Sequence, residues 1–286
     1  MTPDQALAPL PEPYHRLYAT VRATCEPDNR IRGLWLSGSL ARGVADAGSD
    51  LDLLVALADD AYDEFVRDWR SWLDAVTPTL LTKQIPGQIL IFTALTPEMC
   101  RVDGVFERVS QLPESRFRTR IPIIDRDGLD DLIPPLVDGP GPDPDKIAHI
   151  ISEFWRIQAI FPFMINQRKD LLVARSGVDV SAQMLYDLFV ETNQPLPPMG
   201  VKQFSSRLTD EQRPVLEAIP PYGADRDSLI IADLWVCDAM ATHGRAAAER
   251  VGADYPTKLA TAVREFLNRS VEGEGQRTGE TGQSSG

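Results

Sequence analysis

The sequence predicts an α+β protein in which a mixed sheet with flanking helices is followed by a helical bundle. Up to residue 137, apolar runs of strand length alternate with segments of helical periodicity. Residues 138–145 have the sequence DGPGPDPD, and its two glycines and three prolines are typical of a linker. Over residues 146–269 the apolar side chains recur at helical spacing, so we expect two domains, 1–137 and 146–269, joined by this linker.

The first domain is expected to begin with a helix and to continue as a sheet. Residues 13–29 predict a helix that leads into the apolar run from Ile31 to Leu36, which is typical of a buried strand. Residues 59–76 carry apolar side chains at four-residue spacing, which predicts an amphipathic helix. Further strands are predicted at residues 51–57, 79–84, 88–95, 100–106 and 121–124.

The second domain is expected to be entirely helical. Asp143 and Pro144 are suited to the N-cap and the first position of a helix over residues 145–169, which Pro162 should kink or divide. The segment from Ser270 to Gly286 has little apolar content and many glycines, so we expect a disordered tail. Further helical segments are predicted at residues 178–193, 201–207, 210–218, 227–249 and 256–269.

Composition and charge narrow the possible functions. Apolar residues make up 43% of the chain and charged residues 25%, which is a globular composition. The net charge of −13 disfavours binding to nucleic acid, because contacts with phosphates need an excess of Lys and Arg. The 3 cysteines are widely spaced and predict neither a disulfide framework nor a zinc cluster. The first residues lack a basic segment followed by an apolar core, and no apolar run is long enough to span a membrane, so we expect a cytoplasmic location.

Residues 36–55, LSGSLARGVADAGSDLDLLV, are the segment most informative about chemistry. Gly38 and Ser39 follow a predicted strand and are suited to a tight turn whose backbone N–H groups meet a phosphate. Ten residues later come Asp50 and Asp52, which would lie on one face of a strand. Two neighbouring carboxylates repel each other unless a cation lies between them, and oxygen ligands of this kind suit Mg²⁺ with bound phosphates. The alternative is a surface with two solvated aspartates.

This motif resembles that of the nucleotidyltransferase superfamily, in which Gly-Ser, a spacer of about ten residues and Asp-x-Asp follow one another. The order of a mixed domain and a helical domain is similar to the aminoglycoside and lincosamide adenylyltransferases and their uncharacterised relatives. The resemblance implies a polymerase-beta-like catalytic domain over residues 1–137. It also implies Mg²⁺, with two ions, and ATP or another nucleoside triphosphate as the co-substrate.

The superfamily also uses a third carboxylate on a later strand. Asp103, between Val102 and the apolar residues that follow Gly104, is the best candidate for a metal ligand, a general base or both. Asp50 and Asp52 would be the other two catalytic and metal-binding residues. Glu107 would share the strand face of Asp103 and is a reserve candidate for the base. The alternative for Asp103 is a hairpin turn, because Asp-Gly is a strong turn signal.

Further residues are implied as contacts for the triphosphate. Gly38 and Ser39 would hold phosphate oxygens, and Ser39 is also suited to capping a short helix that runs to Arg42. The guanidinium of Arg42 could meet the triphosphate, or it could pair with Asp46 instead. Ser49 could bond a phosphate or cap its own turn. By resemblance, one basic residue of the helical domain reaches the triphosphate, and Lys169 is the candidate, although a solvated helix face is equally consistent with it.

The resulting hypothesis is transfer of a nucleoside monophosphate, AMP from ATP, to a hydroxyl group of a small molecule. An aminoglycoside-like or lincosamide-like antibiotic is the acceptor that the resemblance suggests, which would make antibiotic resistance the biological role. A second hypothesis is a toxin–antitoxin or defence-type enzyme that modifies protein or RNA. A third is a non-catalytic nucleotide-binding module, which the intact pair of Asp50 and Asp52 disfavours. The oligomeric state is not predicted.

Overall fold

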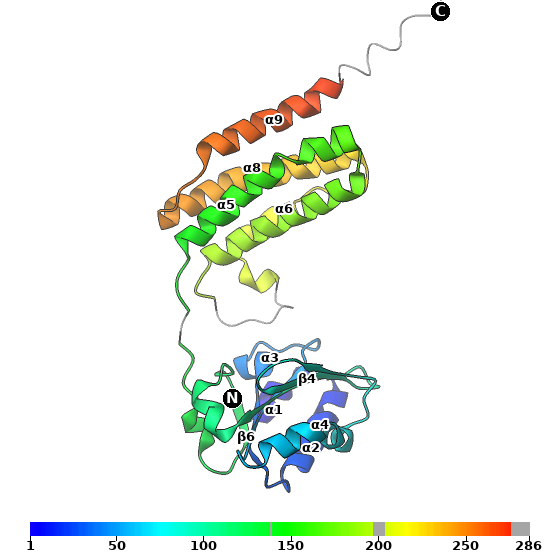
Figure 1. Cartoon of the computed structure of the whole chain (residues 1–286), viewed down its shortest axis with the longest axis vertical. Coiled ribbons are helices and arrows are strands. Elements are labelled where there is room, and N and C mark those ends of the chain that lie inside the picture. The colour runs from blue at the N-terminus through cyan, green and yellow to red at the C-terminus, as the bar shows by residue number, and fades with distance from the viewer. Residues whose placement is uncertain (138, 197–203, 276–286) are drawn as a thin grey trace, which may run out of the picture. The chain divides into compact units, whose positions relative to one another are not determined.

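The computed structural model describes residues 1–137, 139–196 and 204–275, and the chain divides into two compact units, Met1–Val137 and Asp138–Gly286. Figure 1 shows a mixed sheet with helices in the first unit and packed helices in the second. The predicted α+β fold is therefore confirmed. None of the helices in the described ranges is both long enough and apolar enough to cross a membrane.

The first unit is built on a six-stranded sheet in the order β3-β4-β5-β2-β1-β6. Only β2 and β5 pair in parallel, and the other neighbours are antiparallel. This sheet is therefore mixed, as predicted. Its strands are β1 (Ile31–Leu36), β2 (Leu51–Leu57), β3 (Leu81–Ile85), β4 (Leu90–Leu95), β5 (Arg101–Arg108) and β6 (Ile121–Asp125).

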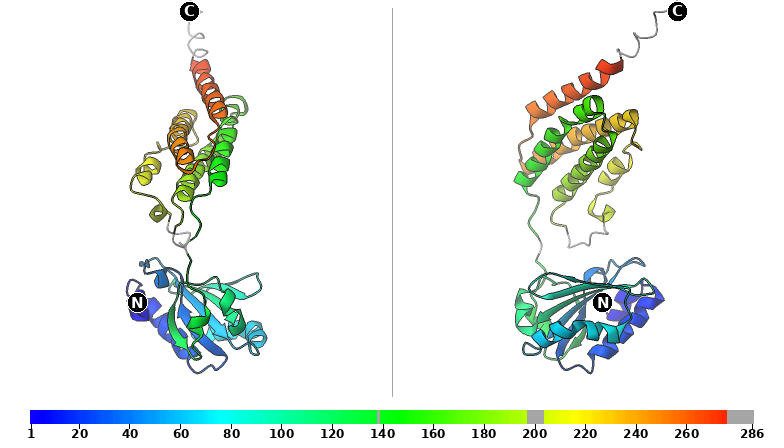
Figure 2. Two further views of the ribbon diagram at one scale, coloured as in Figure 1. Left: turned by 90° about the vertical axis from the view of Figure 1, so that its left-hand side faces the viewer. Right: turned by 45° about the vertical axis from the view of Figure 1, so that its right-hand side comes forward.

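Helices cover one face of this sheet. Apolar side chains of α2 (Glu12–Cys25) and α4 (Tyr62–Val76) form one buried cluster with β1, β2, β4 and β5, and Figure 2 shows these helices against the sheet. The helical face predicted from four-residue spacing is buried here, because Phe65, Trp69 and Leu73 all belong to this cluster. Two short helices complete the segment, α1 (Pro3–Leu7) and α3 (Gly38–Arg42).

The opposite face of the sheet carries a smaller apolar cluster around Trp35 and Leu54. Two 3₁₀ turns, η1 (Val109–Glu114) and η2 (Leu129–Leu132), contribute Leu112 and Leu129 to it. Because Asp52 precedes Leu54 by two residues, its side chain points to this same face. The aspartates therefore lie on the face of the sheet opposite to α2 and α4.

The second unit is a bundle with its own apolar core. Figure 1 shows α5, α6, α8 and α9 side by side, and their buried side chains form one cluster. The predicted cap is present, since Asp143 accepts from the N–H groups of Asp145 (2.9 Å) and Lys146 (3.3 Å). The helices are α5 (Pro144–Gln158), α6 (Leu171–Thr192), α7 (Gln212–Glu217), α8 (Arg226–Val251) and α9 (Thr257–Gly275), with a π-helical segment η3 (Phe163–Arg168) and a 3₁₀ turn η4 (Ser205–Arg207).

The helices of this unit agree with the prediction at Pro162 and differ from it at the start of α6 and in the C-terminal tail. The helix predicted over residues 145–169 is divided, as expected from Pro162, because α5 ends at Gln158 and η3 follows the proline. The helix predicted to start at residue 178 begins seven residues earlier, where the Asp170 side chain caps it. The tail predicted to be disordered from Ser270 is helical to Gly275; residues 276–286, and residues 201–203 of a predicted helix, lie outside the described ranges.

Candidate active site

The parallel pairing of β2 and β5 brings acidic side chains from two distant segments together. Asp52 lies directly opposite Asp103 in the register of these strands. One step earlier Leu51 is opposite Val102, so Asp50 and Arg101 are neighbours two residues before the aspartate pair. Because strand side chains alternate between faces, these four side chains share one face of the sheet. Three carboxylates and one guanidinium therefore form a compact group, which we call the acidic cluster.

Gly38 closes one side of the acidic cluster. The chain turns at the end of β1, where the Ser37 N–H donates to the backbone carbonyl of Asp52 at 2.9 Å. Gly38 has φ of +60°, and a Cβ atom at this position would lie 1.8 Å from Oδ2 of Asp52. Only glycine leaves room for this carboxylate, so the predicted Gly-Ser turn and the Asp-x-Asp strand meet at one point.

Burial and mutual repulsion perturb the carboxylates. Burial, followed by the charges of Asp103 and Asp50, raises the pKa of Asp52 to about 6. The pKa of Asp103 is also raised, mainly by burial, although a hydrogen bond from Thr93 and the charge of Arg101 act in the opposite direction. Oδ1 of Asp103 is buried and has no hydrogen-bond partner among the described residues. The acidic cluster thus holds negative charge that its surroundings only partly compensate.

The donor chemistry of the acidic cluster fits a magnesium ion at Asp52 and Asp103. Both are hard oxygen ligands, they are adjacent, and the unpartnered Oδ1 of Asp103 offers a coordination position. The carboxylate of Asp50 is instead engaged by Arg101, whose Nε and Nη2 donate to its two oxygens. Accordingly, within the described ranges no group of three or more His, Cys, Asp or Glu side chains has the arrangement of a metal site.

Arg42 is the basic residue that the turn places beside the aspartates. It ends α3, and its Nε is buried without a hydrogen-bond partner among the described residues. Burial lowers the pKa of Arg42, and the charge of Asp52 opposes this shift. The alternative pairing with Asp46 is not what the structure shows, because Asp46 accepts from the Gly48 N–H (2.8 Å) and the Ser49 hydroxyl (3.2 Å).

The structure shows the local contacts of the two serines of the motif. Ser49 closes a turn, since its Oγ also accepts from the Asp46 N–H at 3.0 Å, so its observed contacts are those of the turn cap. Ser39 is the second residue of α3, and Ser37 is the N-cap residue, which corrects the prediction that Ser39 caps this helix. Ser39 is half-buried beside Gly38, and its contact with phosphate stays a prediction.

The structure separates the two candidates for the third carboxylate. Asp103 and Gly104 lie inside β5 and pair with β2 and β4, so the alternative of a hairpin turn at Asp103 is wrong. Glu107 shares the face of Asp103 but lies four residues further along the strand, about 13 Å away. It is buried there and hydrogen-bonded to Ser115. Of the two, Asp103 is the one that meets the Asp-x-Asp pair.

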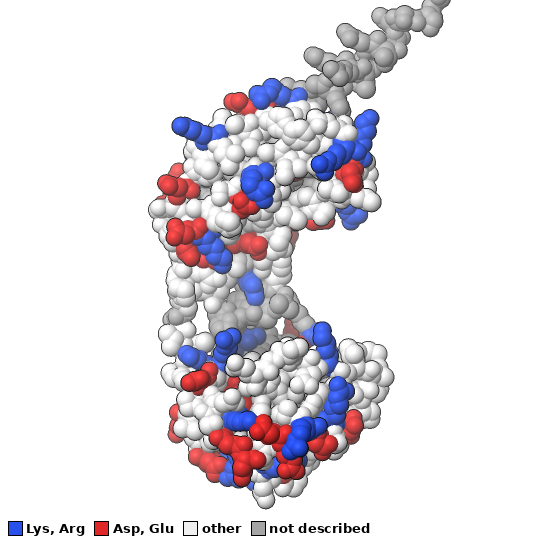
Figure 3. Space-filling model, in the orientation of Figure 1, with Lys and Arg blue, Asp and Glu red and all other residues white. Residues whose placement is uncertain are grey.

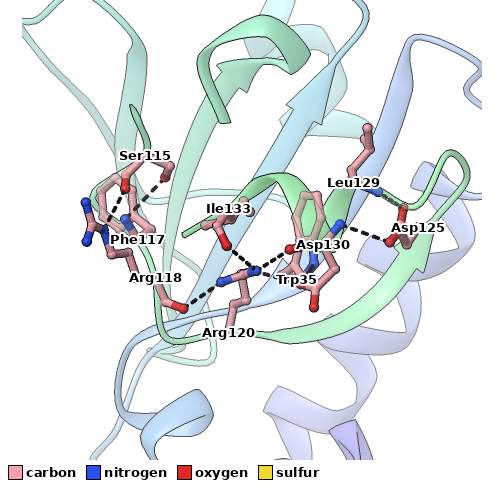
Figure 4. A network of polar contacts seen from close by, with 9 residues as sticks. All are labelled: Trp35, Ser115, Phe117, Arg118, Arg120, Asp125, Leu129, Asp130 and Ile133. Carbon is pink, nitrogen blue, oxygen red and sulfur yellow. Dashed lines mark hydrogen bonds and ion pairs between the residues drawn. The ribbon is translucent and has the colours of Figure 1, made fainter. Parts of the chain in front are cut away.

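A polar network fastens the segment that covers the rest of this face (Figure 4). Arg120 donates to Oδ1 of Asp130 at 2.7 Å and to the carbonyl of Ile133 at 3.1 Å, and the Trp35 indole donates to the same carboxylate oxygen at 2.9 Å. Trp35 is paired with Leu54, two residues beyond Asp52. The network therefore fixes the segment around Asp130 and Ile133 against the sheet immediately beyond the acidic cluster. The end of this face that carries the aspartates lies outside that segment.

Lys169 lies in the second unit. It follows η3 in a left-handed conformation with φ of +54°, just before the Asp170 cap of α6. It lies in the connection between η3 and α6, eleven residues after α5 ends at Gln158. Its contact with the triphosphate stays a prediction.

One member of the acidic cluster, Arg101, is absent from the residues that the sequence suggested. Its signal is present in the chain, because Arg101 precedes Asp103 by two residues just as Asp50 precedes Asp52. Once both segments are strands, the two pairs lie on matching faces. The sequence does not reveal that these two strands pair with each other, and without that pairing the ion pair of Arg101 with Asp50 could not be predicted.

Comparison with known proteins gives one family match and distant structural likenesses. Residues 19–94 match the model of the nucleotidyltransferase domain, a range that contains Gly38, Asp50 and Asp52. An aminoglycoside 6-adenyltransferase from Bacillus subtilis aligns over 90% of this chain and 97% of its own, at 11% identity and a TM-score of 0.43. A nucleotidyltransferase-like protein from Exiguobacterium sibiricum aligns over 83% and 79%, at 15% identity and a TM-score of 0.34. No curated protein matches the sequence.

Proposed function

We propose that this protein is a nucleotidyltransferase that transfers AMP from ATP to a hydroxyl group of a small molecule in a Mg²⁺-dependent reaction; the match of residues 19–94 to the nucleotidyltransferase domain supports the reaction class. The observation that carries the proposal is the register that sets Asp52 beside Asp103, with Gly38 packed against the Asp52 carboxylate. A carboxylate pair beside a glycine turn suits a divalent cation together with the phosphates it carries.

The reaction is an in-line displacement at the α-phosphorus. The oxygen of the acceptor hydroxyl forms a new bond to the α-phosphorus, the bond from that phosphorus to the bridging oxygen breaks, and pyrophosphate leaves with the bonding electrons. The hydroxyl proton passes to a carboxylate of the protein. Asp103 is suited to this step, because burial raises its pKa.

The remaining residues bind and orient the triphosphate. Asp52 and Asp103, with Asp50 as a third ligand, would hold Mg²⁺, which when bound would neutralise charge on the phosphate oxygens. Gly38 and Ser39 form the turn beside the Asp52 carboxylate, and their backbone N–H groups are candidates for contact with phosphate oxygens. Arg42, which is half-buried, brings a positive charge to the same end of the sheet, and its buried Nε is suited to a phosphate oxygen. Lys169 is a further candidate for the triphosphate.

The acceptor that we propose is a hydroxylated antibiotic of the aminoglycoside or lincosamide type. The net charge of −13 favours a cationic small molecule over a nucleic acid. On the face drawn in Figure 3, basic side chains of the described residues are interspersed with acidic ones instead of forming a continuous basic track. Such a track is what a nucleic-acid partner requires.

The test is incubation of the purified protein with α-labelled ATP, Mg²⁺ and a panel of aminoglycosides and lincosamides. We expect acceptor-dependent release of pyrophosphate and transfer of the label to one antibiotic. Asp52→Asn and Asp103→Asn should each lower the rate by at least about 100-fold, because each removes a negative charge that would hold Mg²⁺ at the reacting phosphate. Label on protein or RNA instead would favour the second hypothesis.

Glu107→Gln is the matched control. It removes a buried carboxylate from the same strand and face as Asp103, about 13 Å from the acidic cluster. We expect the rate of Glu107→Gln to stay within about threefold of the wild type, since a group at that distance cannot take a proton from the acceptor. Equal losses in Glu107→Gln and Asp103→Asn would contradict the assignment of Asp103.

A further inference from the structure

Arg101 forms a two-pronged ion pair with Asp50 at the edge of the acidic cluster. Its Nε and Nη2 donate to the two different oxygens of the Asp50 carboxylate. The backbone beneath is anchored, because the Arg101 N–H donates to the Tyr14 hydroxyl at 3.0 Å. The side chain itself is 41% exposed, whereas that of Asp50 is 16% exposed. The guanidinium can therefore swing away from Asp50 without disturbing the strand.

The pair has an electrostatic reason to form. Three carboxylates occupy adjacent positions on β2 and β5, and the positive charge of Arg101 acts on Asp52 and Asp103 as well as on Asp50. Without a metal ion, such a group is stabilised only by positive charges of the protein. Arg101 contacts the Asp50 carboxylate of the acidic cluster directly, and it therefore serves as an internal counterion.

The same contact conflicts with metal binding. A guanidinium that bonds both oxygens of Asp50 leaves that carboxylate engaged, whereas a divalent cation on Asp52 and Asp103 would draw Asp50 in as its next ligand. A cation bound to Asp52 and Asp103 would also be repelled by the positive charge of the guanidinium while that group remains on Asp50. Binding of the metal and the Arg101–Asp50 pair are therefore alternatives.

We propose that Arg101 is a positioning residue that occupies Asp50 in place of the metal, so that Mg²⁺ binds only by displacing the guanidinium. A triphosphate gives the displaced guanidinium a new anionic partner. Nucleotide and metal therefore bind more tightly together than separately, and Arg101 carries part of that coupling. This inference rests on the proposed function, because it requires that the acidic cluster binds Mg²⁺.

The test is isothermal titration calorimetry of the full chain with Mg²⁺ alone, and then with Mg²⁺ in the presence of an ATP analogue that has a methylene group between the α- and β-phosphorus. For Arg101→Ala and Arg101→Gln we expect Mg²⁺ alone to bind about two- to fivefold more tightly than in the wild type. The strengthening of Mg²⁺ binding by the analogue should shrink in both variants. Arg101→Lys keeps the charge and should stay near the wild type.

Arg32→Ala is the matched control. Arg32 forms a comparable two-pronged ion pair with Asp127 in the same unit, at 2.8 and 2.7 Å, away from the acidic cluster. Its removal should leave the Mg²⁺ affinity unchanged. Equal or weaker Mg²⁺ binding in both Arg101 variants, with normal binding in the wild type, would overturn this inference alone. Absence of Mg²⁺ binding to the wild type even in the presence of the ATP analogue would overturn the proposed function as well.

Discussion

At some positions of this protein the surrounding structure accepts only one type of residue. Gly38 is the clearest case, because a positive φ and the contact with Asp52 both exclude a side chain. Gly-Ser is thus more than a flexible turn, since it leaves room for the carboxylate of the second motif. That Gly38 forms a turn could be predicted from the sequence. That the turn touches Asp52 could not, because the two residues are brought together by the pairing of β1 with β2.

Gly38→Ala should abolish the transfer reaction while the protein stays folded. The new Cβ would displace the Asp52 carboxylate, whereas the backbone strain itself costs about 1–3 kcal/mol. Gly128→Ala is the matched control, because Gly128 also has a positive φ of +68° but has no atom within 4 Å of its Cβ position. By urea titration we expect Gly38→Ala to lose more unfolding free energy than Gly128→Ala, because only Gly38→Ala adds a steric clash to the backbone strain. Equal losses of activity would contradict the role of the Gly38–Asp52 contact.

The helices and strands were predicted most accurately where local signals coincide with packing. The strand Ile31–Leu36 and the Asp143 cap of α5 follow directly from apolar runs and capping chemistry. Boundaries shifted where tertiary contacts override local preference, as at the start of α6, where a run that includes Gly177 remains helical. The order β3-β4-β5-β2-β1-β6 could not be predicted, since strand pairing depends on contacts between segments far apart in the chain.

Asp143→Ala should destabilise the second unit by about 1 kcal/mol. The substitution removes the side-chain acceptor for the first N–H groups of α5. Asp143→Ser keeps a capping oxygen and should retain most of the stability. Thermal unfolding followed by circular dichroism measures both. An alanine variant as stable as the serine variant would show that the cap contributes nothing.

A buried carboxylate on α8 should make the stability of the helical unit depend on pH. Burial raises the pKa of Asp233 to about 7, although an amide hydrogen bond from Gln158 opposes the shift. The folded state therefore keeps a proton that the unfolded state releases near pH 4. The stabilisation is present at low pH and is lost as the pH rises through about 7.

Asp233→Asn should remove this dependence. Between pH 5 and pH 8 the wild type should lose about 2–3 kcal/mol more unfolding free energy than the variant, by urea titration at each pH. Asp187→Asn, an exposed carboxylate on α6, should follow the wild type at every pH. Parallel pH profiles for the wild type and Asp233→Asn would contradict the prediction.

Over the full chain, two separate cores stabilise two compact units. Phe106 is fully buried in the core of the first unit and Phe154 in that of the second. Alanine at either position should cost about 3–5 kcal/mol, because each leaves a large cavity. Hydrogen exchange measured by mass spectrometry should show the loss of protection confined to the unit that carries the substitution. Loss of protection throughout the chain in both variants would mean that the units unfold together.

Local sequence was sufficient for the α+β fold and the division of a helix at Pro162, and it predicted the chemistry proposed for the Gly-Ser and Asp-x-Asp motif. These features depend on periodicity, capping and side-chain type within a few residues. The tertiary structure was required for the pairing of Asp52 with Asp103, the contact of Gly38 with Asp52 and the capture of Asp50 by Arg101. The physical reason is that these contacts join segments up to about fifty residues apart, and their geometry depends on a strand register that no local pattern encodes.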